Sequence, residues 1–526
     1  MSDPKPRIVM LVHNSVKGDS RVQKQARSIA GLGWDVTLVG TSPDRRTYEG
    51  TIGDAAVILI PLPVGIHQRP HEFRRGTFRD PLAYPPGPTA NWKRQHLDAR
   101  RADLGAAKAE AAITAEGRGL RWAALQARRV GFKLESKWTG LRLRRSEALQ
   151  RERTRMSSPI DRFTTAFWKR AMGDRAWRRL DPDLWRYELA FGNTIDRLEP
   201  DLIHANDFAV LGVGARAALR ARAAGRDVKL VWDAHEYLPG IRPWRDHPRW
   251  HPAQIAHERE YAPYADAVVT VSEALGELLR RDFALAEPPA VVLNAPSGAR
   301  GPVAADGQLV VRSRKTGERL WAPEESDEPA AVPSLRGRCG IGPEVPLMVY
   351  SGGDSPQRGL DSMIRALRSL PGVHAAFVLP DGSRYAPGLR ELALELGVDE
   401  RVHFAPYVEY YQVAEHLAEA DLGVIPIHHW PNHEIALITK FFEYSHARLP
   451  IAVSDVKAMS EAVLATGQGE VFRADDPADL ARAVEAILAD PERYRKAYEG
   501  PADLDAWTWE RQAEILDGVY RRVLGR

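Results

Sequence analysis

Two long blocks of the chain alternate short apolar runs with helical patterns, and this alternation constrains the fold more than any other feature. The first block opens with the apolar run Arg7–Val12, continues with a helical pattern that ends at Gly33, and reaches a second apolar run at Val36–Val39. The second block starts at Pro346 with the apolar run Leu347–Tyr350. Strands that alternate with helices predict parallel sheets covered by helices. We therefore expect two α/β domains.

Length and composition narrow the class of protein. A chain of 526 residues is too long for one ordinary core, which favours two domains with insertions. The formal net charge of +3 gives no global attraction to nucleic acid, and a single cysteine excludes an internal disulfide. No apolar stretch approaches the roughly 20 residues of a membrane span, and the first apolar run is short for a signal peptide. We expect a cytoplasmic protein that binds no nucleic acid.

The stretch from Asn432 to Asp455 predicts a polar loop, a helix and a buried strand. Lys440 and Glu443 stand three residues apart, so they share one face of the helix. The ammonium can neutralise diphosphate oxygens, and the carboxylate can accept hydrogen bonds from two ribose hydroxyls. An ordinary surface ion pair is the alternative interpretation of the same spacing.

The run K-F-F-E-Y-S-H-A-R-L-P-I-A-V-S-D resembles the donor-nucleotide motif of retaining GT-B glycosyltransferases of family four. The resemblance implies that Glu443 holds the donor ribose. The family often has a second glutamate eight residues earlier, where this chain has Ile435, and the neighbouring Glu434 would point elsewhere on a helix. The resemblance covers most of residues 7–60, 181–296 and 340–526.

Polar residues follow three predicted strands of the first block, as in the segments DLIHANDF and KLVWDAHEY, which also resemble this family. Side chains at the carboxyl ends of parallel strands face the ligand crevice of an open sheet. We expect acceptor-side contacts from Asn14, Lys17, Gly18, Asp19, Asn206 and Asp207, and catalytic roles for His235, Glu236, Arg358 and Lys440. Taken alone, the adjacent residues His235 and Glu236 would also be unremarkable in an ordinary loop without a catalytic role.

A glycine turn follows the strand Leu347–Tyr350 and opens a helix, so its backbone N–H groups can approach a phosphate. It resembles the family's G-R-L-x-x-x-K-G loop, with Arg358 at the lysine position and Gly353 where arginine is common. The family contacts the nucleotide base near Ala405–Val408. The expected donor-binding residues are Gly352, Gly353, Arg358, Tyr407, Val408, Lys440 and Glu443, and no metal ligand is expected.

An insertion at about residues 65–179 departs from the α/β rhythm. Residues 97–155 carry 15 Lys and Arg against 7 Asp and Glu. Val130, Leu134, Trp138 and Leu141 recur there at helical spacing among cations, which predicts a basic amphipathic helix or helical hairpin. The segment is either packed on its own domain with a solvated basic face, or placed against an anionic membrane surface or acceptor.

These observations define the expected organisation. Residues 1–299 form an acceptor-side domain, and residues 300–339 form a linker with a hairpin-like patch at Leu309–Val311 and Arg319–Trp321. Residues 340–505 form the nucleotide-sugar domain, and the helix in residues 506–526 crosses back to the first domain.

The function expected from the resemblance is transfer of a sugar from a nucleoside diphosphate sugar to a hydroxyl acceptor, with retention and without a metal or other cofactor. The acceptor would belong to glycan, surface polysaccharide or glycolipid synthesis, and a lipid-linked acceptor would place the enzyme peripherally on the inner face of a membrane. A sugar-nucleotide epimerase of the same fold and a non-catalytic scaffold are the alternatives.

Overall fold

The computed structural model describes residues 5–63, 80–85, 88–113, 119–155, 159–241, 248–298, 309–321, 331–500 and 502–526. The chain divides into two compact units. Unit 1 comprises Met1–Pro63, Tyr187–Ile241 and His257–Arg526, and it contains two separate sheets. Unit 2 comprises Val64–Arg186 and Arg242–Ala256 and is helical in its described residues.

The first domain of unit 1 is built on a sheet of ten described strands in the order β10-β9-β3-β4-β2-β1-β5-β6-β7-β8. The strands are β1 (Arg7–Leu11), β2 (Asp35–Thr41), β3 (Tyr48–Ile52), β4 (Ala55–Ile60), β5 (Leu202–Asn206), β6 (Lys229–Ala234), β7 (Ala267–Thr270), β8 (Ala290–Val291), β9 (Leu309–Ser313) and β10 (Arg319–Trp321). The run from β4 to β8 is parallel, whereas β3, β9 and β10 pair antiparallel. The hairpin-like patch of the expected linker therefore extends this sheet.

Helix α9 (Trp250–Tyr261) is divided between unit 2 and unit 1. The other helices of the first domain are α1 (Ser20–Gly31), α7 (Trp185–Leu198), α8 (Phe208–Ala223), α10 (Glu273–Phe283) and α19 (Trp509–Leu524). The last of these comes from the end of the chain. Its buried residues Trp509, Leu516 and Tyr520 belong to the same core cluster as β1, β2 and α1. The first domain is thus completed by residues about 200 positions downstream of its other elements.

The second domain has six described parallel strands in the order β13-β12-β11-β14-β15-β16. They are β11 (Leu347–Ser351), β12 (His374–Leu379), β13 (Val402–Pro406), β14 (Leu422–Ile425), β15 (Ile451–Ser454) and β16 (Gly469–Phe472). The helices are α11 (Leu335–Cys339), α12 (Leu360–Ala366), α13 (Ala386–Glu395), α14 (Val413–Leu417), α15 (Thr439–His446), α16 (Lys457–Thr466), α17 (Pro477–Ala489) and α18 (Pro491–Arg495). Two α/β domains with parallel sheets confirm the fold class expected from the sequence.

Strand β11 shows why continuous apolar runs form central strands here. Met348 and Tyr350 enter the core on one face of the sheet, together with α12 and α17. Leu347 and Val349 enter the core on the other face, together with α15 and α16. Successive side chains of a strand point to opposite faces, so a strand covered by helices on both sides must be apolar at every position.

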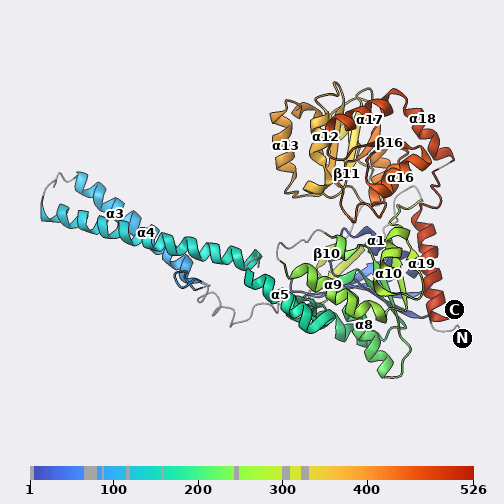
Figure 1. Ribbon diagram of the computed structural model, residues 1–526, viewed down its shortest axis with the longest axis horizontal. Coiled ribbons are helices and arrows are strands. Elements are labelled where there is room, and N and C mark those ends of the chain that lie inside the picture. The colour runs from blue at the N-terminus through green and yellow to red at the C-terminus, as the bar shows by residue number, and fades with distance from the viewer. Residues whose placement is uncertain are drawn as a thin grey trace. The chain divides into compact units, whose positions relative to one another are not determined.

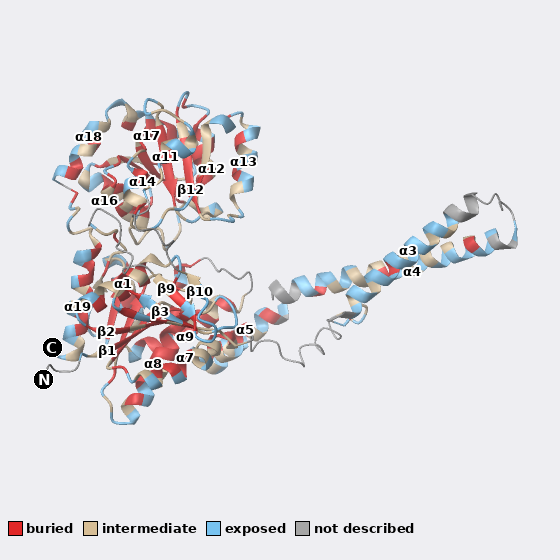
Figure 2. Ribbon diagram, turned by 180° about the vertical axis from the view of Figure 1, so that it is seen from behind, coloured by how far each residue is buried: buried red, intermediate tan, exposed pale blue. Residues whose placement is uncertain are grey.

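Unit 2 contains α3 (Pro88–Ile113), α4 (Leu120–Arg155), α5 (Pro159–Met172) and α6 (Trp177–Leu180). Helices α3 and α4 lie side by side as a hairpin, which confirms the expected helical hairpin (Figure 1). The strands of unit 1 are mostly buried, whereas α3 and α4 are mostly exposed or half-buried (Figure 2). Among the described helices, none is long and apolar enough to cross a membrane.

Candidate active site

The carboxyl ends of β1, β5 and β6 bring together polar residues that are far apart in the sequence. Strand β5 pairs with β1 on one side and with β6 on the other. Asp207 follows β5, adopts φ 71° and caps α8, while His235 and Glu236 follow β6. The parallel register therefore places these groups at one edge of the sheet, as the sequence predicts.

Asp233, near the end of β6, is fully buried and is the centre of a charged network. Arg21 on α1 donates from Nε at 3.0 Å and from Nη2 at 2.9 Å, and Gln25 donates from Nε2 at 2.6 Å. Burial alone would raise the pKa of the Asp233 carboxyl, but Arg21 and His235 outweigh it and hold this pKa well below its usual value. The buried carboxylate is therefore charged and compensated by its own chain.

The same network positions His235. Its Nε2 lies 3.0 Å from Asp233 Oδ2, and its side chain keeps 22% of its surface exposed. Burial lowers the pKa of His235, but the Asp233 carboxylate more than offsets this and leaves the pKa raised. Tyr520 extends the network from α19, because its hydroxyl lies 2.6 Å from Nδ1 of the buried His204, whose Nε2 is 3.6 Å from Asp233. Hence the final helix reaches the residue that holds His235.

Glu236 differs from Asp233, because its buried Oε2 has no hydrogen-bond partner among the residues that the structure describes. Burial, and then the nearby Asp207, raise the pKa of Glu236 to about 7, while His235 and Arg358 oppose this rise. A carboxyl with this pKa changes charge near neutral pH. Arg358 belongs to the second domain, and its positive charge opposes the rise in the pKa of Glu236.

In the second domain a glycine loop and a lysine form one cluster after β11. Gly352 has φ 133°, and a Cβ at this position would lie 2.8 Å from Lys440 Nζ. Tyr350 donates from its hydroxyl to the carbonyl of Gly353 at 2.6 Å, and its ring lies 4.7 Å from Lys440 Nζ. A side chain at position 352 would displace the ammonium, so the glycine is needed for the approach of Lys440.

Lys440 lies in the first turn of α15 and is only 7% exposed. Burial and the nearby Arg358 lower the pKa of Lys440 to about 7, against the opposing effect of Glu443. Within the described part of the chain, neither Lys440 nor Arg358 forms an ion pair, so Glu443 is not the surface ion-pair partner of Lys440. Two close cations beside a helix start and a glycine loop are suited to bind an anion.

Glu443 is half-buried on the same helix, and burial raises its pKa although Lys440 and Lys24 lower it. Lys24, on α1 of the first domain, donates to Asn294 Oδ1 at 3.0 Å and to the Ala295 carbonyl at 2.5 Å. Its own pKa is lowered by burial to about 7. Sequence analysis missed Lys24 and Arg21, because a charged residue on a helix gives no sign of its burial.

The loop after β1 is held mainly by its own residues. Asp19 caps α1 by accepting from Val22 N at 3.2 Å, and it also accepts from Asn14 Nδ2 at 2.7 Å. Gly18 adopts φ 83°, and Lys17 Nζ lies 5.7 Å from the Trp321 ring. These contacts shape the loop at the carboxyl end of β1, and its acceptor-side role stays a prediction.

Three other predicted site residues have different settings. Asn206 is fully buried and donates to the Leu11 carbonyl at 3.1 Å, which braces β5 against β1. Tyr407 and Val408 follow β13, and the side chain of Tyr407 is 45% exposed. Their contacts with an acceptor or a nucleotide base stay predictions.

The loop before α15 contains Ile435, which stands where the family motif often has its second glutamate. The Ile435 carbonyl accepts a hydrogen bond from Ser272 of the first domain at 2.6 Å. Glu434 accepts from the Lys457 backbone N–H at 2.8 Å and lies 2.7 Å from His429 Nδ1. Glu434 is therefore engaged locally. His433 lies near the two cations, since burial and then Arg358 and Lys440 lower its pKa, while the His428 carbonyl opposes this.

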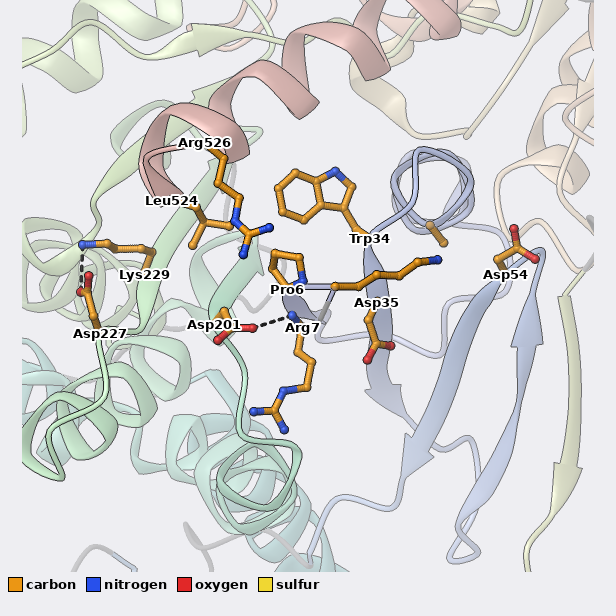
Figure 3. Close-up of a pocket in the computed structure, with 12 residues that line it drawn as sticks. Pro6, Arg7, Trp34, Asp35, Asp54, Asp201, Asp227, Lys229, Leu524 and Arg526 are labelled. Atoms are coloured by element: carbon orange, nitrogen blue, oxygen red, sulfur yellow. Dashed lines mark hydrogen bonds and ion pairs between the residues drawn. The ribbon is translucent and has the colours of Figure 1, made fainter. Parts of the chain in front are cut away.

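A hollow of about 1020 Å³ lies elsewhere, at the amino-terminal edge of the first sheet. Pro6, Trp34 and Asp35 line it, and two of its acids are already used, because Asp201 accepts from Arg7 N at 2.7 Å and Asp227 pairs with Lys229 at 2.9 Å (Figure 3). The described residues contain no group of three or more His, Cys, Asp or Glu that could hold a metal ion.

Comparison with known proteins gives two family matches. The model described as "Glycosyl transferases group 1" matches residues 333–500, and the model described as "Glycosyltransferase Family 4" matches residues 148–295. The first match contains Arg358, Lys440 and Glu443, and the second contains His235 and Glu236. Each of the two domains thus matches a glycosyltransferase model through the segment that carries its candidate residues.

Individual relatives are more distant. A protein of Nocardia farcinica named D-inositol 3-phosphate glycosyltransferase is 29% identical over 314 residues, which are 55% of this chain and 66% of its own length. A Mycolicibacterium smegmatis protein, named GDP-mannose-dependent alpha-(1-6)-phosphatidylinositol monomannoside mannosyltransferase, is 31% identical over 36% of this chain and 52% of its own length. The chain thus spans just under two thirds of the first relative. Sucrose-phosphate synthase from Thermosynechococcus elongatus shares the fold with a TM-score of 0.59 and 15% identity, covering 99% of this chain and all of its own.

Proposed function

We propose that this chain, which belongs to the glycosyltransferases of the family 4 type and has their GT-B fold, transfers a sugar from a nucleoside diphosphate sugar to a hydroxyl acceptor. One observation carries the proposal. Arg358 and Lys440 are two close cations that have no acidic partner in the described structure, and they lie at a glycine loop and a helix start. A diphosphate supplies the two negative charges that this arrangement needs.

The donor is held from the second domain. Lys440 and Arg358 contact the diphosphate, and the backbone N–H group of Gly353 approaches its oxygens. The Gly352 N–H donates instead to the Val378 carbonyl at 3.0 Å. Glu443 accepts hydrogen bonds from the ribose hydroxyls, and the residues around Tyr407 and Val408 lie along the base. Burial makes the ion–diphosphate attraction stronger than it would be in water. The cations thereby stabilise the leaving group without a divalent metal.

The reaction proceeds with retention of the anomeric configuration. The acceptor oxygen attacks the anomeric carbon on the face from which the diphosphate departs, and the phosphate oxygen that leaves takes the proton of the acceptor hydroxyl. His235, whose pKa is raised by Asp233, lies on the acceptor side, and in its protonated form it stabilises the negative charge that develops on the departing diphosphate. Glu236 then orients the acceptor hydroxyl.

The acceptor is proposed to be a hydroxyl of a polyol or glycan, in free or lipid-linked form. Two relatives are named for inositol phosphate and phosphatidylinositol mannoside acceptors, which supports this class. The loop that Asn14, Gly18 and Asp19 shape lies at the carboxyl end of β1, on the same sheet edge as His235. The acceptor therefore approaches from the first domain.

Two measurements test the function. A thermal-shift panel of nucleoside diphosphates identifies the base, because a ligand that binds only the folded protein raises its melting temperature. Nuclear magnetic resonance then gives the anomeric configuration of the product made from the matching nucleotide sugar in the presence of chelator. We expect a retained configuration and full activity with chelator. An inverted product, or activity that chelator abolishes and added metal restores, would overturn the mechanism.

A further inference from the structure

Two acidic residues of the long helix α4 pair with cations of α3. Among its described side chains, the acids Glu135 and Glu147 form ion pairs with Arg100 and Arg94 of α3, the second at 2.5 Å. Leu125, Thr139 and Leu149 are buried along the same helix. The charges of these two described acids are therefore neutralised where the two helices of the hairpin meet.

The face of α4 left exposed is apolar and cationic. Val130, Leu134 and Trp138 follow one another at intervals of four residues and are 58%, 66% and 51% exposed. Lys133, Lys137 and Arg144 border this stripe, are exposed, and make no ion pair with any described residue. Residues four apart lie on one side of a helix. We call these six residues the α4 stripe.

Helix α5 has the same arrangement independently. Its only acid, Asp161, is 3% exposed and pairs with Arg249 at 2.8 Å. Phe163 and Phe167 on its surface are 72% and 51% exposed. Beside them is a groove of about 540 Å³, which is lined by Arg162, Thr165, Ala166, Lys169, Arg170, Pro248 and Pro252. The groove contains three cations and no acid. We call the two phenylalanines with Arg162, Lys169 and Arg170 the α5 patch.

We propose that unit 2 docks on the surface of an anionic lipid bilayer through the α4 stripe and the α5 patch. The exposed apolar side chains enter the boundary between headgroups and acyl chains, and the cations contact the lipid phosphates. Tryptophan and phenylalanine next to Lys and Arg are the side chains that this boundary favours. The acids Glu135, Glu147 and Asp161, which would repel an anionic surface, are paired within the unit.

Other occupants fit less well. Single-stranded nucleic acid would stack its bases on Trp138, Phe163 and Phe167, but the aliphatic Val130 and Leu134 of the same surface offer no stacking face. A lipid boundary accepts both kinds of apolar side chain. A second copy of the chain would bring two faces of the same positive charge together, which opposes association. The long exposed faces of α3 and α4 visible in Figure 2 are thus explained by a lipid surface.

The role of docking rests on the proposed function. If the protein is a transferase, docking places it beside a lipid-linked acceptor. The binding itself requires no catalysis. A result for vesicles therefore tests docking alone, and a result for sugar transfer to a soluble acceptor tests the proposed function alone.

The test is co-sedimentation of the full chain with vesicles of phosphatidylcholine alone and of phosphatidylcholine mixed with phosphatidylglycerol. We expect binding only to the mixed vesicles, with a loss at high salt because the attraction is electrostatic. The variants are Lys169→Glu with Arg170→Glu for the α5 patch, and Leu134→Glu with Trp138→Glu for the α4 stripe. Removing the two cations of the α5 patch lowers the partition coefficient at least about thirtyfold, and placing two carboxylates in the apolar α4 stripe lowers it as well.

The matched control is Arg368→Glu with Arg384→Glu, which reverses two exposed cations of the second domain with the same change in net charge. Its partition coefficient should stay within about threefold of wild type. Far-ultraviolet circular dichroism and a retained melting temperature show that each variant is folded. Equal binding to both vesicle types overturns the proposal, as does a control that loses as much as the patch variants. Tighter binding to an oligonucleotide, or self-association through the same residues, would also contradict it.

Discussion

The two domains of unit 1 treat buried charge in opposite ways. In the first domain, Asp233 is fully buried and accepts three hydrogen bonds from Arg21 and Gln25, so its charge is compensated by the chain. In the second domain, Lys440 is nearly as buried but has Arg358, a second cation, as its main charged neighbour. The pKa shifts follow, because the Asp233 carboxyl is held charged whereas burial lowers the pKa of Lys440 to about 7.

This difference separates scaffold from binding site. A compensated buried charge fixes the positions of α1, β6 and His235 with respect to one another, and removing one member leaves the other without a partner. An uncompensated buried cation costs free energy in the free protein and recovers it when an anion binds. The predictions below therefore expect stability effects in the first domain and ligand effects in the second.

The largest expected effect is on stability. Asp233→Asn removes the carboxylate that faces Arg21 and should lower the free energy of unfolding by about 3–5 kcal/mol, because a buried guanidinium is left without a counter-charge. Urea unfolding followed by fluorescence measures this loss. Lys440→Met serves as the control, and it should leave the free energy of unfolding unchanged or higher. Equal losses in the two variants would contradict the division between scaffold and binding site.

The next effect is on ligand affinity. Lys440→Met should weaken binding of a nucleoside diphosphate by about 1.5–3 kcal/mol, since it removes a charged contact. Isothermal titration calorimetry measures the affinity, and Arg368→Met, on the surface of the same domain, is the matched control for loss of one cation. A variant that binds the diphosphate as tightly as wild type would show that Lys440 does not contact it.

The variant Glu443→Gln separates the role of Glu443 from that of Lys440 on the same helix. It should weaken binding of a nucleoside diphosphate by about 1.5–3 kcal/mol through loss of the ribose contact. Inorganic pyrophosphate, which has no ribose, should bind the variant at least as tightly as wild type, because a nearby negative charge is gone. If both ligands lose the same affinity, Glu443 acts on the diphosphate cluster rather than on the ribose.

Much of the fold could be predicted from the sequence. Apolar runs bounded by turns indicated β1, β11 and β15, and α19 lies within the predicted residues 506–526. Strand β3 was missed because Tyr48–Ile52 reads Tyr-Glu-Gly-Thr-Ile and carries polar residues within a partly exposed antiparallel strand. A continuous apolar run identifies a strand that is buried on both faces of a sheet more clearly than a mixed sequence identifies a strand that is buried on one face.

The candidate site was predicted less completely. Residues at strand ends and in the glycine loop have local signals, so His235, Gly352 and Lys440 could be found. Asp233 is paired by Arg21 from 212 positions away, and Tyr520 reaches His204 across 316 positions. Such partners depend on tertiary packing alone, and no local pattern specifies them.

The pH dependence of ligand affinity should also distinguish Lys440 from a permanently charged group. The pKa of Lys440 in the free protein is about 7, and a bound diphosphate raises it. Affinity for a nucleotide sugar should therefore be full below pH 7 and fall as pH rises above it, by up to about tenfold per unit. Calorimetry across this range measures the fall. Lys440→Arg should flatten it, whereas Lys24→Arg, which removes the other lysine with a pKa of about 7, should not.

The smallest effect concerns the final helix. Tyr520→Phe removes the hydroxyl that contacts His204 and should lower the free energy of unfolding by about 1 kcal/mol, since one buried hydrogen bond is lost. Urea unfolding measures it, with Tyr264→Phe on an exposed tyrosine as control. A loss as large as that of Asp233→Asn would show that Tyr520 supports the whole charged network.

The central claim is that Arg358 and Lys440 form a diphosphate site that needs no metal. Calorimetric titration with the nucleoside diphosphate chosen by the thermal-shift panel, in the presence of chelator, tests it most directly. We predict binding by wild type and a loss of at least about hundredfold in the double variant Arg358→Met with Lys440→Met, which keeps its melting temperature. Binding that requires a divalent cation, or equal affinity in the double variant, would contradict the account.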